Sequence, residues 1–136
     1  MAFTGNYTCN VFKSGLLDGN FDFSGNTFRL ALYTNLATLD ASTTAYTVTG
    51  EASGGNYVAG GQVLTPTVSI SSGVAFVTFN NVSWTGVITA RGALIYKAGD
   101  NGAVCVLDFG SDKTSVTSFQ VQFPAATSTS AIIRLS

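Results

Sequence analysis

Alternation of hydrophobic and polar side chains is the strongest signal in this chain, and it is clearest over residues 27–34. In the segment TFRLALYT, Phe28, Leu30 and Leu32 alternate with residues that point the other way. Because successive side chains of a strand lie on opposite faces of its sheet, this period of two predicts a strand with one buried face.

Six further runs of the same character follow at short spacing. Turn-forming stretches rich in Gly, Ser, Asp, Asn and Pro separate them. The predicted strands are Gln62–Ile70, Val74–Phe79, Val87–Lys97, Ala103–Phe109, Val116–Phe123 and Ala131–Leu135. Short strands with such punctuation predict an all-β fold, namely a single-domain antiparallel β-sandwich that is jelly-roll-like.

Two details refine these strands. The segment Ala98–Gly102 predicts a hairpin turn between the two runs that flank it. Pro66 lies inside the run Gln62–Ile70 and has no amide hydrogen to donate, so this strand is expected to be an edge strand or to break there.

The first 26 residues form a separate N-terminal segment or arm, and residues 27–136 form the sandwich domain. Within the arm, Asn10–Leu17 predicts a short helix with Asn10 as its N-cap and Gly19 as its stop. Phe21 and Phe23 then alternate as if entering the sheet. We expect these two rings to cap the core.

The segment from Asn35 to Leu64 is long for a connection, since most loops have about 4 to 6 residues. Leu39, Tyr46 and Tyr57 are apolar anchors within it. Two interpretations remain open, a surface that contacts a neighbouring molecule and an Ω-loop packed on its own domain.

Composition then limits the choice of partners. Only 10% of the residues are charged, against about 25% in average soluble domains, and the net charge is −1. Weak charge repulsion favours association, so we expect a homo-oligomer. The basic residues are scattered, which predicts no nucleic-acid partner. They are Lys13, Arg29, Arg91, Lys97, Lys113 and Arg134.

Hydrophobic stretches of the length that membranes require are missing from the sequence. The start MAFTGNYTCNVFKSG does not have the form of a secretory signal, and no apolar run approaches the roughly 20 residues of a membrane-spanning helix. We therefore expect synthesis in a cytoplasm and no membrane partner. Cys9 and Cys105 have no CxxC spacing, and we expect both to be small buried thiols.

Catalytic chemistry is poorly represented. The chain has no histidine, which excludes Ser-His, Cys-His and imidazole-zinc sites. The triplet Asp108, Phe109, Gly110 matches the kinase magnesium motif by chance, with Gly110 free to take a positive φ. Asp100, Asp108 and Asp112 lack the pattern of a calcium loop. We expect no enzyme activity, no cofactor and no metal.

Trp84 is the single tryptophan, and it has two interpretations. It is expected to lie in the core between strands. The alternative is a ring that stacks on a sugar, as in a host-glycan-binding module.

Two blocks of sequence carry a family resemblance. They are TFRLALYTNLATLDASTTAYTVTGEASGGNYVAGGQVL and WTGVITARGALIYKAGDNGAVCVLDFGSDKTS, the latter followed by FQVQFPAATSTSAIIRL, and together they cover about residues 27–135. The chain resembles small β-rich virion structural proteins of tailed bacteriophages. The resemblance transfers no catalytic residue.

This resemblance implies a bacteriophage virion protein, most simply a capsid decoration or cement protein that docks on the outside of the shell. The expected partners are the major capsid protein or other virion subunits. The alternative placement is a neck or tail subunit, such as a connector or tail-tip component. For contact with partners we select four aromatic residues, Phe3, Tyr7, Tyr46 and Tyr57, because aromatic rings provide much area at little entropic cost.

Overall fold

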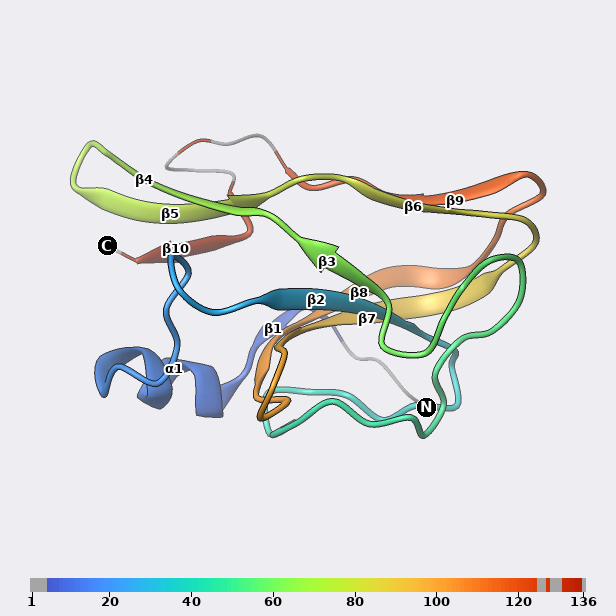
Figure 1. The fold of residues 1–136 in the computed structure, drawn as a ribbon, viewed down its shortest axis with the longest axis horizontal. Coiled ribbons are helices and arrows are strands. Elements are labelled where there is room, and N and C mark those ends of the chain that lie inside the picture. Colours follow the sequence, from blue (N-terminus) through green and yellow to red (C-terminus); the bar gives the residue numbers. More distant parts are fainter. Residues whose placement is uncertain (1–4, 125–126, 128–130, 136) are drawn as a thin grey trace.

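A computed structural model of the protein describes residues 5–124, 127 and 131–135, and these form ten strands and one helix (Figure 1). In chain order the elements are β1 (Tyr7–Thr8), α1 (Asn10–Leu17), β2 (Phe28–Tyr33), β3 (Gln62–Leu64), β4 (Pro66–Ser71), β5 (Val74–Phe79), β6 (Val82–Thr85), β7 (Thr89–Lys97), β8 (Ala103–Thr114), β9 (Ser118–Val121) and β10 (Ile133–Leu135).

The strands form two layers. One layer is a five-stranded sheet in the order β1-β8-β7-β2-β3, and all of its pairs are antiparallel. The other layer consists of two short antiparallel sheets, β10-β5-β4 and β6-β9, which lie side by side above the first (Figure 1). The predicted antiparallel β-sandwich is confirmed.

The centre of the five-stranded sheet, formed by β2, most of β7 and the first half of β8, is buried on both faces. In β2, Arg29 is the only residue that is not buried. Phe28 stacks on Phe23, which also contacts Phe79 of the opposite layer. Tyr33 points the other way, and its hydroxyl donates to the carbonyl of Thr47 over 2.6 Å. The segment between β2 and β3 runs beneath the sheet in Figure 1 and supplies a covering layer without regular structure.

The described part of the N-terminal segment packs on the same core. Tyr7 of β1 pairs with Val106 of β8, and the Cys9 amide donates to the Val104 carbonyl over 2.9 Å. Phe12 of α1 is only 2% exposed. From Gly5 onward this segment is therefore continuous with the sandwich, while Phe3 lies outside the described residues.

The predicted helix is confirmed, but Asn10 is not its N-cap. The N-cap is Cys9, whose side chain makes no capping hydrogen bond. The reason is the sheet beside it: β8 holds the Cys9 amide, and the Cys9 carbonyl accepts from the amides of Phe12 and Lys13. Pairing with β8 thus fixes where the helix begins, and Asn10 becomes its first residue.

The predicted entry of Phe21 and Phe23 into a sheet is wrong. The Asp22 carboxylate accepts from the Ser24 amide and hydroxyl, and the Asn26 side chain accepts from the Asp22 amide. These local bonds bend the backbone into a turn instead of a ladder. Both rings nevertheless pack edge-on against Phe12, so the expectation that they cap the core is confirmed.

The remaining strands agree with the sequence pattern except at some ends. The predicted strand Gln62–Ile70 is divided just before Pro66 into β3 and β4, which belong to different sheets. The hairpin at Ala98–Gly102 is confirmed, with Asn101 at φ 63°. The sequence pattern did not predict β1 or β6, and β8 continues to Thr114 instead of ending at Phe109.

A glycine substitution tests how closely the covering segment approaches the sheet. Gly61 has φ +77°, and a Cβ there would lie 1.7 Å from the Leu30 carbonyl oxygen. Gly110 has φ +87° with nothing within 4 Å. Both Gly→Ala variants incur the left-handed strain, but Gly61→Ala also forces backbone apart. We expect it to lower the free energy of unfolding by about 1–3 kcal/mol more than Gly110→Ala. Urea unfolding measures the difference, and equal losses would contradict this close approach.

Candidate interaction surface

The hairpin β4–β5 turns over two residues with left-handed backbone. Ser72 has φ 53° and Gly73 has φ 76°, and Ser71 pairs with Val74 across the turn. Positive φ at both central positions defines a type I′ turn, whose twist matches that of the strands it joins. The hairpin is therefore regular from its turn to Pro66.

One face of this hairpin is apolar and points toward the inside of the sandwich. Val68 lies opposite Val77, and Ile70 lies opposite Ala75. Val77 belongs to the buried core, which identifies the face. On the same face Leu135 of β10 lies opposite Ala75.

Three side chains of that inward face remain in contact with water. Val68 is 57% exposed, Ile70 75% and Leu135 58%, and we call them the apolar row. The cause is the length of the hairpin, which projects beyond the end of β2 on the side where α1 lies (Figure 1). Alternation along β4 is otherwise regular, with Thr67, Ser69 and Ser71 on the opposite face. Exposed rows of this kind mark interaction surfaces more often than scattered single residues do.

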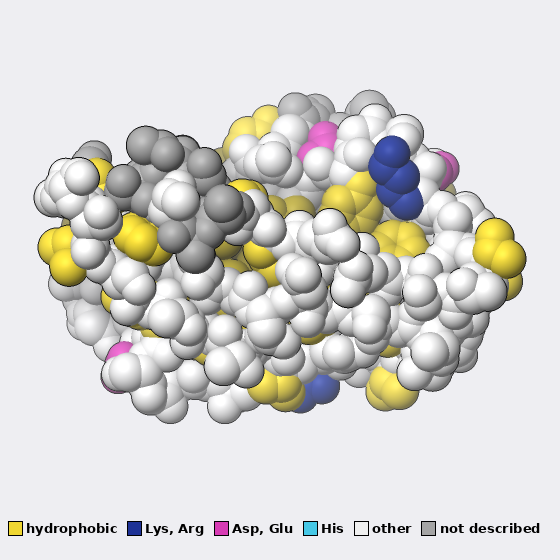
Figure 2. All heavy atoms as spheres, turned by 90° about the horizontal axis from the view of Figure 1, so that it is seen from above, with side chains coloured by type: hydrophobic (Ala, Val, Ile, Leu, Met, Phe, Trp, Pro, Cys, Tyr) yellow, Lys and Arg dark blue, Asp and Glu magenta, His cyan; other side chains and the backbone are white. Residues whose placement is uncertain are grey.

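The layer that carries the hairpin is also unusually free of charge. From Ala52 to Ala90 the chain contains no Asp, Glu, Lys or Arg, and this stretch includes β3 to β6. Figure 2, which views this layer from above, shows few charged side chains and several patches of hydrophobic atoms among uncharged polar groups. This face can therefore approach another surface with little loss of ionic hydration.

A groove of about 440 Å³ lies between the C-terminal part of β8 and β9. Phe109 and Phe119 contribute rings whose centroids are 6.0 Å apart, and Lys113 adds a positive charge at its wall. The remaining lining is mostly Ser, Thr and Gln.

Tyrosines and one carboxylate hold the segment that covers the lower face of the sheet. The carboxylate of Glu51 accepts from the hydroxyl of Tyr46 over 2.7 Å, from the hydroxyl of Tyr57 over 2.5 Å and from the amide of Gly60 over 2.8 Å. The Tyr57 hydroxyl in turn accepts from the Leu32 amide of β2. We call Glu51, Tyr46, Tyr57 and Gly60 the Glu51 cluster, and the bond from the Leu32 amide ties this cluster to β2.

Of the four aromatic residues selected from the sequence, the structure brings together Tyr46 and Tyr57, whose hydroxyls share the Glu51 carboxylate. Tyr7 is half-buried in β1 and Phe3 is not described. Tyr46 stacks on Tyr96 at 4.6 Å, and Tyr57 packs on Trp84 at 5.4 Å.

The tyrosines of the covering segment are half-buried, where exposed rings were expected. Burial, and then the hydrogen bond to Glu51, raises the pKa of Tyr46 and of Tyr57 above the usual tyrosine range. The segment thus packs on its own domain, as the Ω-loop interpretation has it. Contact with a neighbour through these rings stays a prediction, and the apolar row is the feature that sequence reasoning missed.

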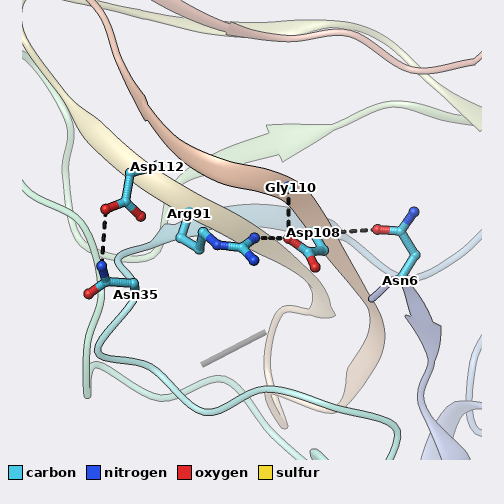
Figure 3. A network of polar contacts seen from close by, with 6 residues as sticks. All are labelled: Asn6, Asn35, Arg91, Asp108, Gly110 and Asp112. Atoms are coloured by element: carbon cyan, nitrogen blue, oxygen red, sulfur yellow. Dashed lines mark hydrogen bonds and ion pairs between the residues drawn. The ribbon is translucent and has the colours of Figure 1, made fainter. Parts of the chain in front are cut away.

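A second polar network fastens the chain around β8 (Figure 3). Arg91 of β7 forms an ion pair with Asp108 of β8, and the Asp108 carboxylate also accepts from the Gly110 amide over 2.8 Å. Asn6 accepts from the Asp108 amide over 2.6 Å, which anchors the N-terminal segment. The kinase-like triplet therefore lies within β8, where its pairing with β7 is interrupted by a bulge, and Gly110 has φ 87°, as expected.

The other carboxylates considered as metal ligands also have protein partners. Asp112 accepts from the amide group of Asn35 over 3.0 Å (Figure 3). Asp100 accepts from buried Lys97 over 2.9 Å, and this bond lowers the pKa of Asp100. Within the described ranges no group of three or more Asp, Glu, Cys or His side chains could hold a metal ion. Within the same residues, no helix has the length and apolarity needed to cross a bilayer.

Trp84 is 2% exposed, so the expectation of a core residue is confirmed and a sugar cannot stack on its ring. Cys9 and Cys105 are free and buried, as expected. Burial raises the pKa of the Cys9 thiol to about 11 and also raises that of Cys105.

Comparison with known proteins gives no match of any kind. No protein-family model, no curated protein and no solved structure is significantly similar to this chain.

Removal of the Glu51 carboxylate tests the Glu51 cluster. Glu51→Ala leaves two tyrosine hydroxyls and the Gly60 amide without their acceptor. We expect the free energy of unfolding to fall by about 3 kcal/mol. Tyr46→Phe, which removes one donor and leaves Glu51 with two, should cost less. A loss below about 0.5 kcal/mol for Glu51→Ala would show that the cluster does not hold the segment.

The two thiols report on the fold through their reactivity. Only a thiolate attacks a disulfide reagent, and burial disfavours the thiolate of Cys9 and Cys105. At pH 8 we expect neither thiol of the native protein to react with DTNB, and both to react at once in unfolding urea. Rapid labelling of the native protein would contradict the buried placement.

The raised pKa of the Cys9 thiol also makes stability depend on pH. The thiol contributes to the free energy of unfolding below about pH 9, and this contribution is lost as the pH rises toward 11.

Proposed function

We propose that this protein is a non-catalytic structural subunit of a tailed-bacteriophage particle, and specifically a head decoration protein that docks on the outside of the shell. The observation that carries the proposal is the apolar row of Val68, Ile70 and Leu135, exposed on a layer in which β4, β5 and β6 carry no charge. Resemblance of the sequence to small phage virion proteins supplies the setting.

The charged side chains support a structural role, because most of their bonds go to other groups of the same domain. Both oxygens of Glu51 accept hydrogen bonds that hold the covering segment. Asp108 pairs with Arg91, and Asp100 pairs with Lys97. The carboxylates with the most partners thus stabilise the fold, which is the arrangement expected of a building block.

Surface chemistry supports docking on a shell. A decoration protein holds neighbouring shell subunits together by burying apolar area and pairing polar groups across the contact. This layer, which has few charges, offers hydrophobic side chains beside many uncharged polar groups (Figure 2). Such a surface binds through shape and hydrogen bonds, with little dependence on salt.

Particle labelling tests this placement. Gold-tagged antibody against the protein is expected to spread over the heads of intact particles. Particles assembled without the protein should release their DNA at a lower temperature than complete particles, because a cement protein adds contacts across the shell. Label confined to the neck or tail tip would overturn the decoration role in favour of a tail subunit, and unlabelled particles would overturn the virion assignment.

A further inference from the structure

We propose that β4 is the contact edge of a symmetric dimer, in which a second copy of this chain adds its own β4 to the sheet β10-β5-β4. The inference rests on the proposed structural role and names the partner of one of its surfaces. The result would be a six-stranded antiparallel sheet across a two-fold axis.

The outer edge of β4 is free among the described residues. β4 is the last strand of its sheet, and it is exposed from Thr67 to Ser71. The edge of β6 is different, since the backbone of Thr85 bonds to both the amide and the side chain of Asn56. Natural proteins usually protect such an edge with charges or a covering loop, and β4 has neither in the described chain.

The hairpin turn determines which backbone groups face outward. Residues that flank a two-residue turn form a hydrogen-bonded pair, here Ser71 and Val74. The pattern alternates, so Ser69 also bonds to β5, while the amides and carbonyls of Val68 and Ile70 point away from it. Two donors and two acceptors are thus presented along the free edge.

These groups match a second copy of themselves. When two β4 strands pair antiparallel about Ser69, Val68 of one lies opposite Ile70 of the other, and their outward groups form hydrogen-bonded pairs. The same register extends the apolar row across the axis. Pro66, which has no amide hydrogen, then lies outside the paired residues.

Charge favours a second copy over a charged partner. The residues from Ala52 to Ala90 carry no charge, so two copies meet here without the like-charge repulsion that other faces would bring. The nearest charge in the sheet is Arg134 of β10, and the two Arg134 residues would be separated by five strand spacings, roughly 24 Å. This exceeds the Debye length of about 8 Å in physiological salt.

A cysteine cross-link tests the register directly. About a two-fold axis at Ser69 the two Ser69 Cα atoms lie about 4.5 Å apart, within the range that a disulfide spans. Ser69→Cys is therefore expected to give a covalent dimer under mild oxidation of the purified full chain. Ser71→Cys is the matched control, because its two copies would be separated by about 14 Å along the strands. The native thiols are buried and do not interfere.

The molar mass in solution is a second, independent test of the dimer. Light scattering from about 1 µM to 1 mM, where small interfaces associate, should show the mass rise toward twice 14.1 kDa. Ile70→Lys places a charge in the paired edge and should keep the protein monomeric. Ser83→Lys adds the same charge on β6 and should leave the dimer unchanged.

The outcomes separate this inference from the proposed function. A monomer at all concentrations, or Ser69→Cys cross-linking no faster than Ser71→Cys, would overturn the dimer even if gold label covers the heads. Equal dimerisation of Ile70→Lys and wild type would overturn β4 as the contact. A β4 dimer with unlabelled particles would support the edge and refute the virion role.

Discussion

Burial of the centre of the five-stranded sheet on both faces is the constraint on which the rest of the structure depends. The second layer covers one face, and no sheet formed by the described residues covers the other. The irregular segment between β2 and β3 covers that second face. Its buried backbone amides and carbonyls need hydrogen-bond partners, because no sheet ladder pairs them. Glu51 and the tyrosines around it supply those partners, which explains a carboxylate deep in an otherwise neutral stretch.

Local signals gave the parts of the fold that depend on neighbours in sequence. Alternation over Phe28–Tyr33, the hairpin turn at Asn101 and the break at Pro66 all follow from backbone chemistry that a reader of the sequence can see. The N-cap and β1 could not be predicted in this way, because β8 decides both from about 100 residues away. Long-range pairing overrides local preference there.

The interaction surface likewise has features that local sequence predicts and features that only the tertiary packing determines. Tyr46 and Tyr57 were predicted to contact a partner because they are aromatic side chains in a glycine-rich loop. In the structure their hydroxyls donate to Glu51 of the same domain. The alternation in PTVSIS is visible in the sequence, and it correctly marks one apolar face of β4. What the sequence cannot show is that the hairpin extends past the sheet it covers, because that depends on how two layers are placed.

The short outer strand β10 has a consequence for how far a sheet of this kind can grow. It is only three residues long and carries the exposed charge of Arg134. Strands of that length with a cation make poor templates for addition of another chain. If β4 joins to its own copy, both remaining borders of the sheet are of this unreceptive type. Growth would then stop at a closed pair, and a β-rich protein of low net charge would avoid open-ended fibres.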